Sequence, residues 1–214
     1  MPLRAVIFDL WETLIDWDRE AAAEMVARVS GLAGDHFAER WNRSTSRYIG
    51  PIRVALADAG VPADVLEEVC ALRHEYIRRA VVPRPGAVDT LRALRLQGLG
   101  VGLITVCSED VERVWPETAF AGLFDAEVFS SRLGISKPDP RIYTHCCEIL
   151  GVAPADAVFV GDGANDELAG AQRAGLRALL IHRSGEPPLW PEVAAWDGPR
   201  VTSIPEVLEV LELC

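Results

Sequence analysis

The feature that most constrains the fold is a series of short apolar segments that are separated by stretches of helical periodicity. The apolar segments are rich in Val, Ile, Leu and Ala, which is typical of strands buried on both faces of a parallel sheet. We predict strands at Ala5–Leu10, Gly100–Thr105, Glu127–Phe129, Ala157–Val160 and Arg177–Ile181. The segments between the last four have the length of single crossover helices, so the strands are expected to run parallel. The predicted fold class is therefore α/β, with a doubly wound parallel sheet.

The chain between the first two predicted strands has a different character. From residue 16 to residue 82, Ala, Glu, Arg and Val recur at helical spacing, which indicates a small inserted helical bundle. The Pro-Arg-Pro-Gly run that begins at Pro83 marks the return to the sheet. From Glu186 to Pro199 the chain is rich in Pro and Trp without periodicity, and we interpret it as a surface excursion. The expected organisation is a sheet domain of residues 1–15 and 83–214 and a helical domain of residues 16–82.

The charge balance excludes some kinds of partner. The 214 residues include 21 Lys and Arg against 32 Asp and Glu, which gives a formal net charge of −11. Nucleic acids and anionic membranes require a basic surface, so we expect neither as a partner. The cysteines have no metal-ligand spacing such as C-x-x-C, and no apolar run has the length of a transmembrane helix. We therefore expect a cytoplasmic protein, and the sequence leaves a homodimer open.

Polar side chains able to bind an anion or a cation follow several of the predicted strands. The carboxyl ends of parallel strands meet at one edge of a sheet, where open α/β folds bind their ligands, so these side chains are expected to converge. One lysine lies in a Ser-Lys-Pro-Asp-Pro loop that proline keeps out of a helix. The converging residues are Asp9 at the end of the first strand with Thr13 after it, Thr105 at the end of the second with Ser108 after it, Lys137 in the proline loop, and Asp162 and Asp166 after the fourth.

This constellation resembles that of the haloacid dehalogenase (HAD) superfamily of hydrolases. The resemblance covers nearly the whole chain, and four motifs in strand contexts are a much stronger signal than one. It implies a Rossmann-like core and a helical cap of the C1 type, formed by residues 16–82. The four motifs stand in the order of the family, and they are Asp9 with Thr13, then Thr105, then Lys137, then Asp162 with Asp166.

The resemblance also implies a mechanism for a small anionic substrate. Asp9 would attack phosphorus or carbon and form a covalent aspartyl intermediate. Lys137 would orient Asp9, while Thr13 and Thr105 complete the catalytic set and Thr105 holds the substrate anion with backbone N–H groups. Lys137 is the only lysine among 21 basic residues, which supports its assignment because the motif needs a compact point charge. The implied cofactor is Mg²⁺, bound by Asp9, the backbone carbonyl of Trp11 and Asp162, with Asp166 close by.

Two positions of the first motif depart from the family pattern. Phosphatases of this superfamily usually carry a second Asp two residues after the nucleophile, which protonates the leaving oxygen and later activates water. Here that position is Trp11, and an indole N–H does not exchange a proton near neutral pH. Loss of a general acid/base typically costs about 10²- to 10⁴-fold in rate. The next position, usually Gly in the family, is Glu12.

Three hypotheses are compatible with these departures. The first is an atypical Mg²⁺-dependent phosphohydrolase whose leaving group needs no proton, such as an acyl phosphate, or whose acid is Glu12, Asp16 or a cap residue. The second is a 2-haloacid dehalogenase, because halide leaves without a proton and those relatives carry Tyr at the position of Trp11. Asp162 speaks against it, since dehalogenases are metal-free and have a small polar residue there. The third is a non-catalytic binding or regulatory protein, whereas a phosphonatase is excluded because the cap has no lysine.

Substrate contacts are expected from the cap and from the loops after the first two strands. We expect Trp11 to line the pocket and Ser108 to lie near the substrate anion. Two cap arginines, Arg43 and Arg47, are candidates for binding a substrate carboxylate or phosphate. A solvated helix face explains their spacing equally well.

Overall fold

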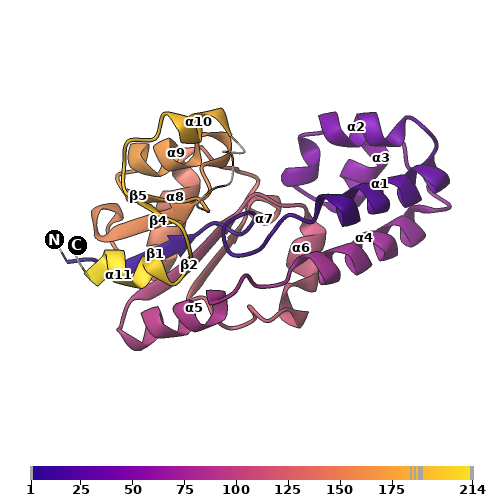
Figure 1. Ribbon diagram of the computed structural model, residues 1–214. Helices are drawn as coiled ribbons and strands as arrows, with labels where there is room; N and C mark the ends of the chain where they lie inside the picture. The colour runs from indigo at the N-terminus through magenta and orange to yellow at the C-terminus, as the bar shows by residue number, and fades with distance from the viewer. Residues whose placement is uncertain (1, 184, 186, 188–189, 213–214) are drawn as a thin grey trace.

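The computed structural model describes residues 2–183, 185, 187 and 190–212, with a six-stranded sheet at one end and a group of helices at the other (Figure 1). All neighbouring strands are parallel, in the order β3-β2-β1-β4-β5-β6. The strand order reverses between β1 and β4, which is the arrangement of a doubly wound Rossmann-like sheet and confirms the predicted α/β class. The strands are β1 (Ala5–Phe8), β2 (Gly100–Thr105), β3 (Ala126–Phe129), β4 (Ala157–Gly161), β5 (Arg177–Ile181) and β6 (Arg200–Val201).

The register of β1 fixes what surrounds its carboxyl end. Phe8 lies opposite Val160 of β4, and the N–H of Asp9 donates to the carbonyl of Val160 at 2.9 Å. On the other side β1 pairs with β2, whose last residue is Thr105. Asp9, Thr105 and Asp162 therefore follow or end three adjacent strands at one edge of the sheet, as the sequence predicts.

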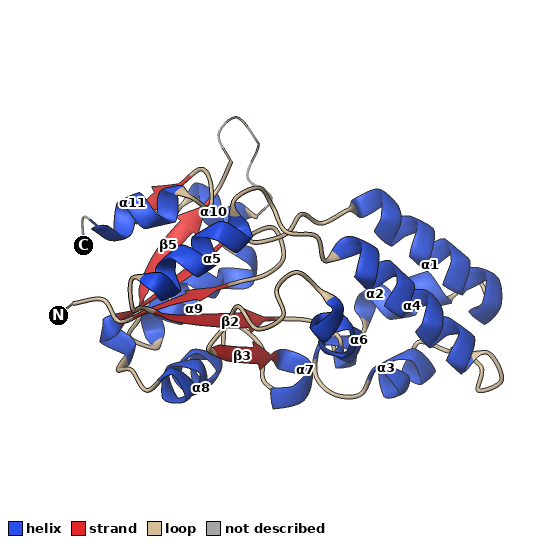
Figure 2. Ribbon diagram, turned by 90° about the horizontal axis from the view of Figure 1, so that it is seen from below, coloured by secondary structure: helices blue, strands red, loops and turns tan. Residues whose placement is uncertain are grey.

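Helices cover both faces of the sheet (Figures 1 and 2). Val6 and Phe8 of β1 contribute to an apolar cluster with α5 and α11, and Ala5 and Ile7 contribute to a second cluster with α8 and α9. All four side chains are fully buried, so β1 is covered on both faces. The helices are α5 (Ala87–Leu96), α6 (Glu109–Val114), α7 (Ser130–Leu133), α8 (Pro140–Leu150), α9 (Glu167–Arg173), α10 (Pro191–Ala194) and α11 (Glu206–Glu212), with 3₁₀ turns at Trp115–Glu117, Pro154–Asp156 and Ala164–Asp166.

Residues 16–82, which the structure describes in full, contain the remaining helices, and we call them the helical segment. They form a group beside the sheet rather than over one of its faces (Figure 1). Within the group α1 packs against α4, and α4 also packs against α6 of the sheet domain. Phe37 and Trp41 of α2 stack in its buried interior with ring centroids 5.8 Å apart. The helices are α1 (Arg19–Ala33), α2 (Phe37–Arg43), α3 (Ile52–Asp58) and α4 (Leu66–Ala80), with a 3₁₀ turn at Ser46–Tyr48.

Some elements differ from the sequence prediction. α6 ends at Val114, because Pro116 cannot continue an α-helix and the chain passes into a 3₁₀ turn. β6 was not predicted, since a two-residue strand leaves no periodic pattern. The excursion predicted from Glu186 to Pro199 contains α10, and Glu186 itself lies outside the described residues.

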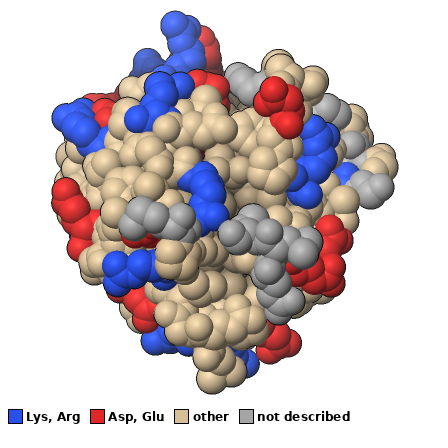
Figure 3. Space-filling model, turned by 90° about the vertical axis from the view of Figure 1, so that its left-hand side faces the viewer, with Lys and Arg blue, Asp and Glu red and all other residues tan. Residues whose placement is uncertain are grey.

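The surface at the sheet end carries charges of both signs (Figure 3). Acidic and basic side chains are interspersed over this face, with uncharged surface among them. Among the residues placed in the structure, no helix combines the length and the apolar character needed to cross a membrane.

Candidate active site

A buried lysine joins two carboxylates at the carboxyl end of β1. Lys137 Nζ donates to Oδ1 of Asp9 and, at 2.5 Å, to Oε2 of Glu167 at the start of α9. The side chains of Asp9 and Glu167 are only 6% and 1% exposed. Burial alone would lower the pKa of Lys137, but the charges of Asp9 and Glu167 outweigh burial and raise it. Lys137 is therefore a permanent cation that holds one oxygen of Asp9 in place.

Asp162, directly after β4, completes a cluster of three carboxylates. Oxygen atoms of Asp9, Asp162 and Glu167 all lie within 4.8 Å of one another, and all three residues are buried. Burial and the charge of Asp9 raise the pKa of Asp162. Burial, together with repulsion by Asp9 and Asp162, raises the pKa of Glu167 well above its ordinary value despite the attraction of Lys137. Three carboxylates face one ammonium, so this set of hard oxygen donors fits a divalent cation such as Mg²⁺.

Asp166, which the sequence places close to the metal ligands, lies outside this cluster in the structure. Its side chain is 51% exposed and pairs with Arg173 at 3.2 Å. Asn165 and Asp166 have positive φ values of 50° and 60°, so the chain turns just before α9. This turn directs the next residue, Glu167, to Lys137. α9 consequently begins at Glu167.

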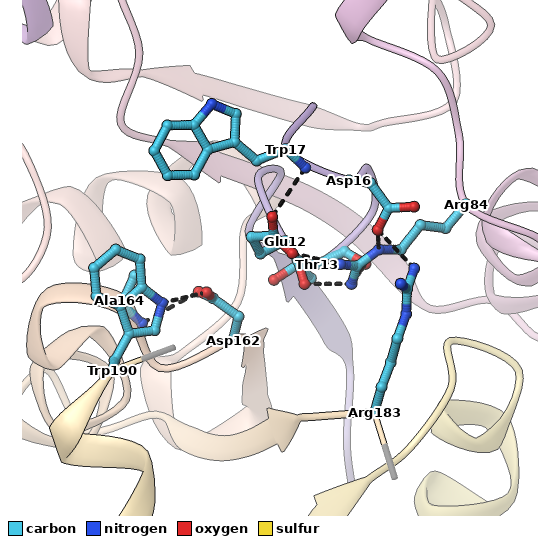
Figure 4. Close-up of polar contacts among 9 residues, drawn as sticks. All are labelled: Glu12, Thr13, Asp16, Trp17, Arg84, Asp162, Ala164, Arg183 and Trp190. Carbon is cyan, nitrogen blue, oxygen red and sulfur yellow. Dashed lines mark hydrogen bonds and ion pairs between the residues drawn. The ribbon is translucent and has the colours of Figure 1, made fainter. Parts of the chain in front are cut away.

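Two N–H groups hold the carboxylate of Asp162 (Figure 4). The backbone N–H of Ala164 donates to Oδ1 at 3.2 Å, and the indole N–H of Trp190 donates to Oδ2 at 2.6 Å. Both hydrogen bonds favour the charged carboxylate, so they oppose the rise in its pKa that burial and Asp9 cause. Asp162 is thus oriented by donors from its own loop and from the residue that precedes α10.

Two buried hydroxyls lie near the carboxyl ends of the central strands, one on Thr13 in the loop after β1 and one on Thr105 at the end of β2. Thr13 and Thr105 are fully buried, and neither hydroxyl oxygen has a hydrogen-bond partner within the described chain. A buried polar group without a partner typically costs about 1–3 kcal/mol. The oxygen atoms of a bound anion would satisfy both hydroxyls, which agrees with the role expected for these residues.

Arg84 holds the loop after β1 in place (Figure 4). Glu12 has a φ of 57°, in the region that favours glycine. Its Oε2 accepts from Nη2 of Arg84 at 2.9 Å, and its Oε1 accepts from the backbone N–H of Trp17 at 2.9 Å. Asp16 accepts from Nε of Arg84 at 2.7 Å and from Arg183 at 2.6 Å. Both carboxylates that the sequence offers as substitute acids are therefore bound to Arg84.

Trp11, the residue at the position of the missing Asp, is half-buried and packs against the larger apolar core. Ser108 lies in a buried polar cluster, where its hydroxyl accepts from Arg73 at 3.1 Å and donates to Asp110. Arg73 and Asp110 form an ion pair of 2.6 Å with side chains 4% and 0% exposed. This pair joins α4 of the helical segment to α6, so the hydroxyl of Ser108 is engaged between the two parts of the molecule.

The two arginines of the helical segment that are candidates for substrate binding have different surroundings. Arg43 is 80% exposed and pairs with Glu39 at 3.4 Å. It lines an open depression of about 600 Å³ whose lining residues all belong to the helical segment, so the structure does not support its predicted contact with a substrate at Asp9. Arg47 lies over the ring of Tyr48 at 4.5 Å, and the carbonyl of Tyr48 accepts from Ser130 of the sheet domain at 2.7 Å. Arg47 therefore lies where the helical segment meets the sheet domain.

Three residues of the site were not found from the sequence. Glu167 is adjacent to the predicted Asp166, and only the positive φ values before it decide which carboxylate turns inward. Arg84 lies in the Pro-Arg-Pro-Gly run, and its position between two prolines was the sequence signal that could have indicated a fixed role for this charge. Trp190 lies in the stretch interpreted as a surface excursion, whose tryptophan content was a sign of burial.

Comparisons with known proteins agree on one family. The family model of the haloacid dehalogenase-like hydrolases matches residues 3–175. A phosphatase of Mycobacterium tuberculosis is 30% identical over 203 residues, which cover 87% of this chain and 90% of the relative. A crystal structure of a 2-haloacid dehalogenase from Pseudomonas syringae pv. Tomato is similar with a TM-score of 0.71 and 25% identity over 99% of both chains. A HAD phosphatase from Thermococcus onnurineus has a TM-score of 0.77 at 20% identity over 98% of both chains, a likeness of fold.

Proposed function

Because the chain belongs to the haloacid dehalogenase-like hydrolases, we propose that it is a Mg²⁺-dependent phosphohydrolase in which Asp9 is the nucleophile. The observation that carries the proposal is the buried cluster at the end of β1. There Lys137 binds Asp9, and Asp162 and Glu167 offer further oxygen ligands to a cation. A phosphatase that is 30% identical over nearly the whole chain supports the reaction class.

The chemistry follows from how Asp9 is held. Lys137 binds Oδ1 of Asp9, so we assign the attack to Oδ2. This oxygen forms a bond to the phosphorus of the substrate while the bond from phosphorus to the leaving oxygen breaks, which leaves a phosphoryl group on Asp9. Water then attacks phosphorus, the bond to Asp9 breaks, and phosphate is released. Lys137 keeps its charge throughout and stabilises the carboxylate that is formed again.

The residues that would hold Mg²⁺ are Asp9, Asp162 and Glu167, whose ligand oxygens lie within 4.8 Å of one another. The family resemblance adds the backbone carbonyl of Trp11 to this proposed set. When bound, the cation supplies positive charge that offsets the carboxylates and attracts an anionic substrate. Glu167 takes the place that the family pattern gives to Asp166. The hydroxyls of Thr13 and Thr105 are the proposed donors to the phosphate oxygens, because both are buried and without a partner.

The substrate class follows from the absence of Asp at position 11. Trp11 cannot protonate a leaving oxygen, and Glu12 and Asp16 are bound to Arg84. We therefore propose substrates whose leaving group needs no proton, such as acyl phosphates. The second half of the reaction lacks the same group to activate water, so hydrolysis of the phosphorylated Asp9 is expected to be the slower half.

The test measures phosphate release by the metal-stripped full chain. Acetyl phosphate should be hydrolysed when Mg²⁺ is added, a simple alkyl phosphate much more slowly, and EDTA should abolish both rates. Asp9→Asn should abolish turnover without loss of folding. Equal rates with and without EDTA would overturn the proposal.

A 2-haloacid dehalogenase is the second candidate. It is favoured by the aromatic Trp11 and by the likeness to the dehalogenase from Pseudomonas syringae pv. Tomato. The pair of Asp9 and Asp162 opposes it, because without a cation these carboxylates repel a carboxylate substrate. Release of chloride from 2-chloropropionate in EDTA would establish this candidate. The relatives are named as enzymes, so we do not propose the non-catalytic alternative.

Other expectations from the sequence stay proposals. Residues 16–82 would act as a cap on a core of residues 1–15 and 83–214, of which residues 213 and 214 lie outside the described chain. A small anionic substrate, a cytoplasmic location and a homodimer are further proposals. The net charge of −11 supports the absence of nucleic-acid or anionic-membrane partners.

A further inference from the structure

Trp190 reaches the carboxylate cluster from a stretch that contains none of the four catalytic motifs. Its indole N–H donates to Oδ2 of Asp162 at 2.6 Å, across 28 residues of the chain (Figure 4). The indole N–H of Trp196, in the same stretch, donates instead to the backbone carbonyl of Pro199 at 3.0 Å. Two half-buried tryptophans a few residues apart thus have polar partners of different kinds, and that of Trp190 is a proposed metal ligand.

A second contact fixes Trp190 relative to the loop after β4. Gly163, the neighbour of Asp162, has a φ of 88°, and a Cβ at this position would lie 2.6 Å from Cγ2 of Val193. Val193 of α10 is 4% exposed, and its N–H donates to the carbonyl of Trp190 at 3.2 Å. α10 is therefore seated directly on the loop that carries Asp162. Packing as well as the hydrogen bond keeps the indole at the carboxylate.

The two donors to Asp162 fix the orientation of its carboxylate while leaving it able to bind a cation. Oδ1 accepts from Ala164 and Oδ2 accepts from Trp190. Each carboxylate oxygen has two lone pairs, so both oxygens keep capacity for a further partner. Removal of such an outer hydrogen bond to a metal ligand typically weakens metal binding by about 10- to 100-fold.

We propose that Trp190 is a positioning residue that orients Asp162 for the binding of Mg²⁺. The inference rests on the proposed function, because it takes the cluster of Asp9, Asp162 and Glu167 as the Mg²⁺ site. Trp190 acts through Asp162 rather than on the substrate. Trp190 is thereby part of the active site, and Val193 of α10 supports it.

The experiment measures Mg²⁺ affinity by titration calorimetry of the metal-stripped full chain, without any substrate. Trp190→Phe keeps an aromatic ring and removes the N–H, and its dissociation constant for Mg²⁺ should rise by about 10- to 100-fold. Trp196→Phe makes the same substitution in the same stretch and should leave the constant unchanged. Thermal unfolding in EDTA checks that each variant is folded. In an Asp162→Asn background, Trp190→Phe should cause no further weakening.

Trp190→His separates the hydrogen bond from packing, because histidine keeps a ring N–H but fills less space. If Trp190→His binds Mg²⁺ more weakly than the wild type but more tightly than Trp190→Phe, the proposal is supported. If Trp190→His binds Mg²⁺ as weakly as Trp190→Phe, or more weakly, the proposal is contradicted. If the wild type binds Mg²⁺ and Trp190→Phe binds it equally well, the role of Trp190 is overturned while the proposed function stands. If the wild type binds no Mg²⁺, the proposed function and this inference are both overturned.

Discussion

Arg84 and Glu12 form an ion pair of 2.9 Å in which the arginine side chain is only 7% exposed. Glu12 belongs to the chain that leads into the helical segment, and Arg84 belongs to the chain that returns from it. The pair therefore joins the two connections in the loop that follows Asp9. The pair also engages the carboxylate of Glu12, which is one of the candidates to substitute for the missing acid.

Substitution of Glu12 by Gln should leave catalysis intact. If Glu12 were the general acid, its loss would cost about 10²- to 10⁴-fold in rate. Since its carboxylate binds Arg84 and Trp17, we expect the rate of acetyl phosphate hydrolysis and its pH profile to stay close to those of the wild type. Steady-state kinetics across a range of pH values measures both. A loss of the size given above would show that Glu12 transfers a proton.

Substitution of Trp11 by Asp should restore the proton donor of the family pattern. We expect turnover of alkyl phosphates to rise by about 10²-fold or more, because an acid at this position can protonate a poor leaving group. Turnover of acetyl phosphate should change less, since its leaving group needs no proton. The ratio of the two rates is the measurement, and an unchanged ratio would contradict the account of substrate class.

Whether Glu167 rather than Asp166 binds Mg²⁺ can be tested with one substitution at each of these neighbouring positions. Glu167→Gln should weaken Mg²⁺ binding, because Glu167 lies within 4.8 Å of Asp9 and Asp162. Asp166→Asn is the matched control and should leave the affinity unchanged, because the side chain of Asp166 is half-exposed and pairs with Arg173. Calorimetric titration with Mg²⁺ distinguishes the two. The opposite pattern would return the ligand role to Asp166.

Mg²⁺ binding should strengthen as pH rises. The pKa values of Asp162 and Glu167 are raised, so the metal-free folded protein retains protons that a cation must displace. The unfolded chain loses these protons at lower pH, so the metal-free protein should become less stable as pH rises through the raised pKa values. Mg²⁺ should offset this loss. Thermal unfolding over a pH series that extends upward from about 4, the ordinary carboxyl pKa, with Mg²⁺ or with EDTA, measures the effect. Mg²⁺ stabilisation that declines as pH rises would contradict it.

Removal of one member of the buried pair of Arg73 and Asp110 should destabilise the protein more than removal of both. Asp110→Asn leaves the buried guanidinium without its counter-charge and should lower the free energy of unfolding by about 3–5 kcal/mol. The double variant Arg73→Met, Asp110→Leu should recover much of this loss, because it removes both buried charges. Arg78→Met breaks the exposed pair with Glu117 and is the control, with little effect expected. Urea unfolding of the wild type and of these three variants gives the free energies of unfolding to be compared.

The site residues that the sequence predicts are placed by strand ends and by a proline loop, whereas the others are placed by backbone turns and packing. Asp9, Thr105, Lys137 and Asp162 were predictable, because strand ends and a proline loop are visible as apolar runs and breakers. The choice of Glu167 over Asp166 was not, because it depends on positive φ values at two residues that are not glycine. Trp190 was not, because its contact with Asp162 depends on how α10 packs on Gly163. Arg43 was assigned on spacing alone, and spacing does not say which way a helix face is turned.

The central claim is that Asp9 carries the phosphoryl group during turnover. Hydrolysis of the phosphorylated Asp9 is expected to be the slower half of the reaction, so the intermediate should accumulate. Acid quenching during turnover of acetyl phosphate with Mg²⁺, followed by mass spectrometry of the peptide that contains Asp9, detects it directly. The account predicts one added phosphoryl group on this peptide, absent in EDTA and absent in Asp9→Asn. Turnover that depends on Mg²⁺ but leaves this peptide unmodified would contradict the account.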